Sequence, residues 1–132
     1  MSTLKVDTIR DNGSGFNDVV TFANSGGTEN ARLCRAFVNF DGTGAVAIRA
    51  NFNVNSITDN GTGDYTVNFA NAMSDANYCI IGSVSLPGVN AGYVSFPVSS
   101  SGNQAAASNR FMTPKENGVS TDMSFVNVAV FR

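Results

Sequence analysis

The stretch from Arg35 to Phe69 constrains the fold more than any other part of the chain. Its sequence, RAFVNFDGTGAVAIRANFNVNSITDNGTGDYTVNF, alternates apolar and polar residues and is interrupted by two Gly-rich segments. Alternation at period two puts successive side chains on opposite faces of a strand. Asn and Gly accept the positive φ angles that tight hairpin turns require. The pattern therefore predicts three antiparallel strands joined by two turns, and with them an all-β architecture.

The middle strand of this stretch, Ala45–Val54, has the most regular alternation. We expect it to be a half-buried antiparallel strand, because one of its faces is apolar and the other largely polar. The apolar face carries Val46, Ile48, Ala50, Phe52 and Val54, and the opposite face carries Ala47, Arg49, Asn51 and Asn53.

The rest of the chain extends the same architecture. Strands are predicted at Leu33–Phe40, Tyr78–Leu86, Tyr93–Val98, Arg110–Thr113 and Thr121–Arg132. The last strand is partly apolar on both faces, which favours a central position between two layers or at a subunit interface. With no amphipathic helix and no fixed repeat, about seven or eight strands spaced about ten residues apart predict an antiparallel β-sandwich over residues 31–132, a fold in which Greek-key connections are common.

Residues 1–30 differ from the rest in being polar, Gly-rich and only weakly periodic. Leu4, Val6 and Ile9 form one small apolar patch that cannot bury much surface alone. We expect an extended N-terminal arm that pairs with sister chains as a trimer stem or attaches to another component. An unstructured tail is the alternative, because such a composition lacks the apolar surface needed to fold by itself.

Composition narrows the classes of function. Only 14% of the 132 residues are charged, against roughly 25% in typical soluble domains, and the net charge of −2 gives no basic footprint for nucleic acid. The pattern of a signal peptide is missing, and no apolar run approaches the roughly 18 residues of a membrane span. We therefore expect no nucleic acid, no membrane insertion and assembly in a cytoplasm. Cys34 and Cys79 lie in apolar strand patterns and are predicted to be buried free thiols; whether they approach each other stays open.

Catalytic chemistry has few candidates, because the chain contains neither His nor Trp. A Ser-His-Asp or Cys-His arrangement is thereby impossible. Asp59 and Asp64 flank one hairpin turn, but turn formation explains them better than paired glycosidase carboxylates. The same loop lacks the terminal glutamate and the alternating carboxylates of a calcium loop. We expect no enzyme activity, no cofactor and no metal.

The stretch Arg35–Phe69 and the opening MSTLKVDTIRDNGSG resemble tail-fibre and related structural proteins of tailed bacteriophages, especially those of cyanobacteria. The similarity is dense from Ala36 to Tyr78 and thin after Tyr78. In related chains such a segment lies near the distal head of a longer fibre, whereas here it follows only the short arm. The resemblance implies a homotrimer located in the virion tail, with the arm held by other tail or baseplate proteins.

A tail fibre of this kind would bind a host cell-surface glycan through its distal loops. Aromatic faces with neighbouring amides suit sugars, which makes Asn90, Tyr93, Asn103 and Gln104 the candidate receptor-binding residues, although ordinary core or interface positions explain the aromatics better. Two alternatives remain. One is a purely structural virion component, such as a collar, head fibre or baseplate decoration, and the other is a lectin domain outside a virion.

Overall fold

A computed structural model describes residues 19–24, 27–85, 104–114 and 118–132. These residues contain ten strands and no helix, so the predicted all-β fold class is confirmed. The chain divides into two compact units, Met1–Leu33 and Cys34–Arg132.

The described residues of the first unit form an antiparallel hairpin. Strand β1 (Val19–Asn24) pairs with β2 (Gly27–Arg32), with Val19 opposite Arg32 and Asn24 opposite Gly27. The predicted arm of residues 1–30 therefore includes most of a β-hairpin. The apolar patch of Leu4, Val6 and Ile9 lies outside the described residues.

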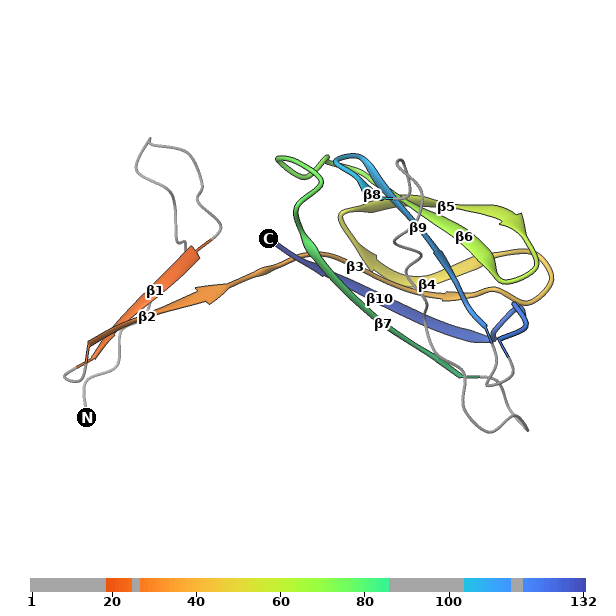
Figure 1. The fold of residues 1–132 in the computed structure, drawn as a ribbon, viewed down its shortest axis with the longest axis horizontal. Coiled ribbons are helices and arrows are strands. Elements are labelled where there is room, and N and C mark those ends of the chain that lie inside the picture. Colours follow the sequence, from red (N-terminus) through yellow and green to blue (C-terminus); the bar gives the residue numbers. More distant parts are fainter. Residues whose placement is uncertain (1–18, 25–26, 86–103, 115–117) are drawn as a thin grey trace. The chain divides into compact units, whose positions relative to one another are not determined.

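The second unit is a sandwich of two four-stranded antiparallel sheets (Figure 1). One sheet has the order β4-β3-β10-β7 and the other β5-β6-β9-β8. The strands of the first sheet are β3 (Cys34–Asp41), β4 (Ala47–Phe52), β7 (Cys79–Ser85) and β10 (Phe125–Phe131). Those of the second are β5 (Val54–Gly61), β6 (Asp64–Phe69), β8 (Gln104–Ala105) and β9 (Ser108–Met112). The predicted β-sandwich is thus confirmed.

The last strand, β10, lies in the middle of its sheet. It pairs with β3 on one side and β7 on the other, so the first and last strands of the unit are neighbours. Val126, Val128 and Val130 are buried, while the alternate residues of the strand face outward. The strand is therefore central within its sheet, but only one of its faces is covered in the single chain, so its predicted place between two layers or at a subunit interface stays a prediction.

The core between the sheets is aromatic at its centre. Phe40 from one sheet meets Tyr65 from the other at a centroid distance of 5.1 Å and an interplanar angle of 75°, and Phe111 packs against both. All three are fully buried. Edge-to-face contacts of this kind are favourable because the positive ring edge meets the negative ring face.

A polar contact joins the sheets at one end of this core. The Tyr65 hydroxyl lies 2.7 Å from an Asp122 carboxylate oxygen and 3.0 Å from the Gly42 carbonyl oxygen. A Cβ atom at Gly42 would lie 2.4 Å from the Tyr65 hydroxyl oxygen, so a side chain there would displace the ring. Asp122 also accepts a hydrogen bond from the Gly63 amide at 2.7 Å. The Asp122 carboxylate therefore links the turn at Gly63 to the Tyr65 ring of the core.

The prediction of one half-buried strand at Ala45–Val54 is wrong. The chain leaves the first sheet at Asn53, which has a φ of 53°, and Val54 begins β5 in the second sheet. Asn53 holds this corner by donating to the carbonyls of Arg35 and Asn71. Every residue of β4 is exposed, because this strand is the edge of its sheet. The apolar–polar alternation of the sequence runs through this corner without a break. Asn53 was its one local signal, because Asn adopts a positive φ more readily than most residues.

The prediction of two buried thiols is also wrong. Cys79 is exposed and Cys34 half-buried. Both lie opposite Phe131, one on each neighbouring strand, so two strand spacings separate them. Two spacings amount to about 9–10 Å, beyond the reach of a disulfide, which needs Cα atoms within about 7 Å.

Candidate functional site

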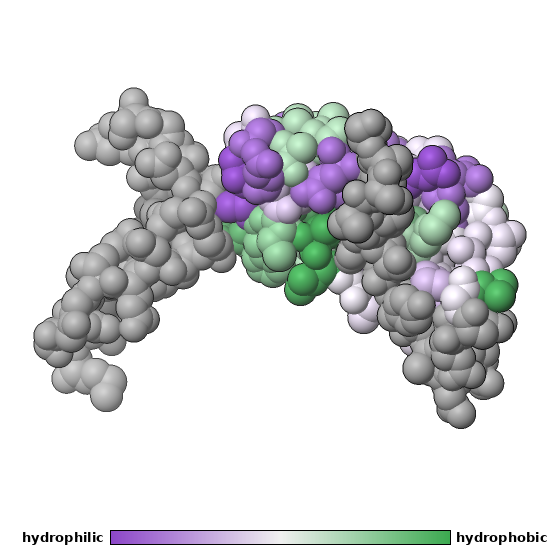
Figure 2. Space-filling model, in the orientation of Figure 1, coloured by the Kyte–Doolittle hydropathy of each residue, from purple (hydrophilic) through white to green (hydrophobic). Residues whose placement is uncertain are grey.

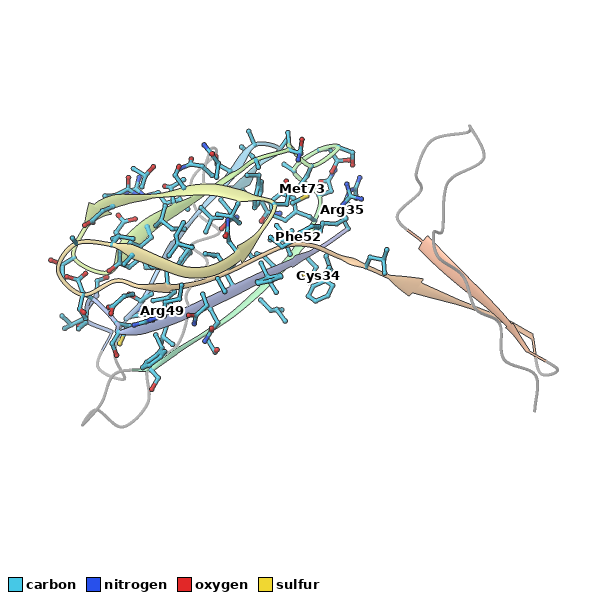
Figure 3. The ribbon with its side chains drawn as sticks, turned by 180° about the vertical axis from the view of Figure 1, so that it is seen from behind. Cys34, Arg35, Arg49, Phe52 and Met73 are labelled. Carbon is cyan, nitrogen blue, oxygen red and sulfur yellow. The ribbon has the colours of Figure 1, made fainter. Side chains whose placement is uncertain are left out.

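The outward surface of sheet β4-β3-β10-β7, called the apolar face here, carries a row of hydrophobic side chains. Strand register aligns them across the sheet in the order Phe52, Phe37, Ala129 and Ile81. The three large members are 54%, 42% and 54% exposed, respectively. The rings of Phe37 and Phe52 stack with centroids 6.2 Å apart. Phe52 is the last residue of β4, and Arg49 precedes it on the same strand (Figure 3). Single exposed hydrophobic side chains are common on protein surfaces, but a row of large ones makes this surface a candidate interaction site.

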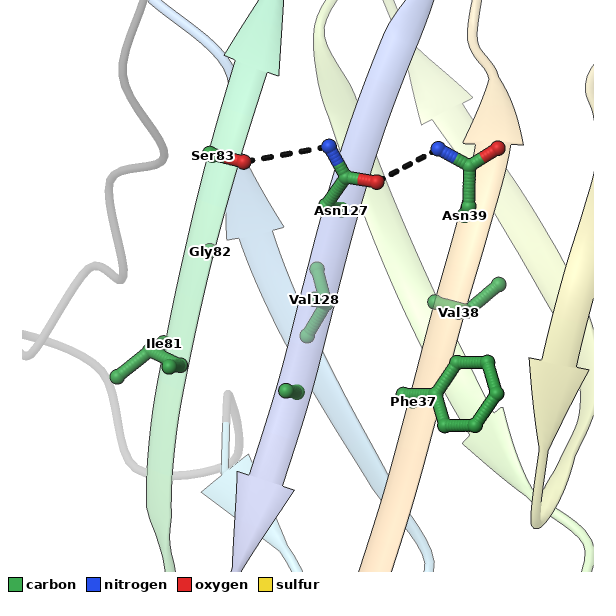
Figure 4. Close-up of a pocket in the computed structure, with 9 residues that line it drawn as sticks. Phe37, Val38, Asn39, Ile81, Gly82, Ser83, Asn127 and Val128 are labelled. Carbon is green, nitrogen blue, oxygen red and sulfur yellow. Dashed lines mark hydrogen bonds between the residues drawn. The ribbon is translucent and has the colours of Figure 1, made fainter. Parts of the chain in front are cut away.

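The next row on the apolar face is polar and internally bonded. The side-chain amide of Asn39 donates to the side-chain oxygen Oδ1 of Asn127 at 2.6 Å, and the side-chain amide of Asn127 donates to the Ser83 hydroxyl at 3.2 Å (Figure 4). Register places the three on adjacent strands β3, β10 and β7. Each of these groups thus already has a partner within the row.

A third row contains the only ion pair of the apolar face among the described residues. The Arg49 guanidinium lies 4.4 Å from the centre of the Phe125 ring and donates to Asp41 at 2.7 Å. Asp41 also accepts hydrogen bonds from the hydroxyl and amide of Thr43, which lower the pKa of its carboxyl. The charges therefore compensate each other, and the aromatic ring covers the cation.

A shallow hollow of about 320 Å³ lies between these rows. Phe37 and Asn39 line one side and Ile81 and Ser83 the other, while the small Ala129 leaves the space between them empty (Figure 4). Figure 2 shows hydrophobic residues of the second unit gathered where β7 begins beside the end of β10. The hollow is apolar along most of its lining, which suits a hydrophobic side chain better than a charged ligand.

The outward surface of the second sheet, called the polar face here, differs in kind. Asn68 donates to the hydroxyls of Ser56 and Thr58, and Asn60 donates to the hydroxyl of Thr66. Asp64 and Arg110 add a two-point ion pair, with an Nε–oxygen distance of 2.9 Å. The Arg110 guanidinium lowers the pKa of the Asp64 carboxyl, although partial burial opposes this.

The predicted receptor-binding residues are only partly within the described structure. Asn90, Tyr93 and Asn103 lie outside it. Gln104 begins β8, and its amide nitrogen donates to the carbonyls of Ala76 at 2.7 Å and Tyr78 at 2.9 Å. This nitrogen therefore holds the loop before β7, and a receptor contact through Gln104 stays a prediction.

Residues of the apolar face on β3, β4 and β7 were missed by the sequence reasoning. Only β10 gave a usable signal, since its two faces are both partly apolar. On β4 the regular alternation predicted that the apolar residues face the core. On β7 nearly every residue of the predicted strand is apolar, so the sequence does not distinguish inward from outward positions. A strand that is apolar on both faces was the one pattern that could have pointed to this surface.

No group of three His, Cys, Asp or Glu side chains gathers among the described residues as a metal site. Asp59 accepts a hydrogen bond from the Gly61 amide at 2.9 Å, which confirms its predicted role in the turn. Within the same part of the chain, no helix is long and apolar enough to cross a membrane.

Comparisons with protein-family models, with curated proteins and with solved structures found no match. The likeness to tail-fibre proteins rests on the residues quoted above for it.

Proposed function

We propose that the chain is a non-enzymatic virion protein of the tail-fibre type. It acts as a homotrimer, its N-terminal arm is held by another tail or baseplate protein, and loops of the β-sandwich head bind a host cell-surface glycan. Assembly takes place in the host cytoplasm.

The apolar face is the observation that carries this proposal. Phe37, Phe52, Ile81 and Phe125 are each more than two-fifths exposed in a chain with few charges. A row of large exposed apolar side chains is the kind of surface that permanent assemblies cover with a neighbouring subunit. The resemblance of Arg35–Phe69 and of the first residues to tail-fibre proteins supports a tail fibre as the kind of assembly.

A second candidate is a purely structural virion component, such as a collar, head fibre or baseplate decoration. The same apolar face favours it, because covering that face requires only neighbouring copies and no receptor. The two candidates differ in where the protein lies on the virion and in whether it contacts the host.

Immunogold labelling and adsorption competition together test the proposal. Antibody raised against the purified protein is expected to label the tail or baseplate of virions that carry it. An excess of purified protein is expected to slow adsorption of those virions to host cells, because it occupies the receptor. Tail labelling without competition would favour the structural candidate, and labelling confined to the head or neck would contradict the tail-fibre proposal.

A further inference from the structure

We propose that the apolar face is the surface on which neighbouring copies of this chain pack in a closed ring. In this arrangement the bulky half of the face, Phe52 and Phe37, contacts the hollow half of the next copy, Ala129 and Ile81. The three-fold order of the ring rests on the proposed function, whereas the choice of surface rests on the features below.

The shape of the face supports a contact between unlike halves. Along one row, β4 and β3 carry two stacked phenylalanine rings, while β10 carries an alanine in the same row. The result is a ridge on one side and the 320 Å³ hollow beside Ala129 on the other. Rings of subunits use two different surface patches per copy, each complementary to the other, and this single face supplies both.

The size of the apolar surface fits a second copy. An aromatic side chain offers roughly 150–250 Å² for burial, so Phe37, Phe52, Phe125 and Ile81 leave on the order of 400 Å² exposed at their observed fractions. That is about half of the roughly 800 Å² that each partner contributes to a stable interface. The amide row and the ion-paired row extend the face by a polar margin, as interfaces usually have.

The electrostatics of the face also fit a copy of itself. Arg49 and Asp41 compensate each other, so this ion pair adds no net charge that would repel an identical neighbour. The amides of Asn39 and Asn127 are bonded within their own row, so burying them leaves few unsatisfied groups. The apolar lining of the hollow beside this row favours a protein occupant.

The test is the native mass of the full chain and of three lysine variants by light scattering. We expect about 41 kDa for the wild type, three times the 13.8 kDa chain. Phe37→Lys and Ile81→Lys are expected to reduce the mass threefold, because each places a charge in the contact. Met112→Lys is the matched control, since Met112 is also exposed but lies on β9 in the other sheet. Unchanged far-ultraviolet circular dichroism would show that the variants are folded.

The outcomes separate this inference from the proposed function. A trimer that survives both face variants would overturn the inference and leave trimer formation to the arm, which the tail-fibre proposal also allows. A wild-type monomer would overturn the inference and the proposed homotrimer together. If Ile81→Lys stayed trimeric but no longer slowed virion adsorption, the face would be a glycan site, and the inference would be wrong.

Discussion

The two outward surfaces of the sandwich are built on the same core yet differ in kind. On the polar face, Asn, Ser and Thr side chains bond one another across β5 and β6, and the ion pair of Asp64 and Arg110 completes the surface. On the apolar face, phenylalanine and isoleucine side chains occupy equivalent outward positions. Both sheets obey the same alternation, so the inward residues explain the fold and only the outward residues distinguish the surfaces.

The difference between the two faces indicates which of them can stay exposed to solvent. Polar side chains that bond each other and water can stay exposed at little cost in free energy. Exposing aromatic rings to water is unfavourable, and a partner that covers them removes this cost. A charged share of 14% leaves the chain with few means of keeping both faces solvated. In the proposed assembly, the polar face would therefore be the outer surface.

The largest effect is expected from a matched pair of substitutions on one strand. Phe40 and Phe37 both lie on β3, but Phe40 is 0% exposed and packs on Tyr65, whereas Phe37 is 42% exposed on the apolar face. Phe40→Ala should lower the free energy of unfolding by about 3–5 kcal/mol, because it opens a cavity in the core. Urea denaturation at a fixed protein concentration measures this.

Phe37→Ala should act on association instead. If copies cover the apolar face, the wild-type unfolding midpoint rises with protein concentration, and this dependence weakens in Phe37→Ala. At concentrations where the wild type is monomeric, the variant should lose less than about 1 kcal/mol. Equal losses for Phe37→Ala and Phe40→Ala under those conditions would remove the distinction between core and face.

A smaller effect on the free energy of unfolding is expected from the ion pair of Asp64 and Arg110 on the polar face. Arg110 keeps the folded-state pKa of Asp64 below its usual value, which is about 3.9 in an unfolded chain. The stabilisation is therefore complete above that pH and is lost as the pH falls through the folded-state pKa. Its size is on the order of 1 kcal/mol, because the half-exposed Arg110 side chain keeps the pair in contact with water.

Urea unfolding of the wild type and Asp64→Asn across acidic pH measures this contribution. The difference in stability between the two should be constant near neutral pH and should shrink as Asp64 becomes protonated. Arg110→Gln, which removes the partner, should reduce the same difference at neutral pH. Parallel curves for the wild type and Asp64→Asn down to the lowest pH would show that the pair contributes nothing.

The smallest effect is expected on the hydroxyl–amide row of the polar face. Asn68→Ala removes hydrogen bonds to Ser56 and Thr58 that are replaced by water. We expect a loss of less than about 0.5 kcal/mol and no change in native mass. A change of mass in this variant would place an interface on the polar face and reverse the comparison.

Much of the fold follows from local pattern in the sequence. The hairpin of β5 and β6 is marked by its Asn-Gly-Thr-Gly turn, and the central place of β10 by apolar residues on both its faces. Period-two alternation is a local property of the chain, so it identifies strands without knowledge of their partners.

The apolar face could not be predicted in the same way, because outward and inward are defined only by the second sheet. On β4 the pattern placed Phe52 in the core, yet the corner at Asn53 sends the chain to the other sheet and leaves Phe52 outside. Cys79 was predicted to be buried because it lies in the nearly continuous apolar run of β7, where inward and outward residues look alike. A surface composed of residues from β3, β4, β7 and β10 depends on a strand order that no single segment encodes.

Thiol labelling tests most directly whether the apolar face is covered by sister copies. In a background with Cys34→Ser and Cys79→Ser, a reporter is introduced by Ser83→Cys in the hollow or by Thr58→Cys on the polar face; both positions are exposed in a single chain. The rates of maleimide labelling of the native full-length protein are then compared. The account predicts that Ser83→Cys reacts at least about tenfold more slowly than Thr58→Cys and accelerates when Phe37→Lys is added. Equal rates for the two reporters in the wild-type assembly would contradict it.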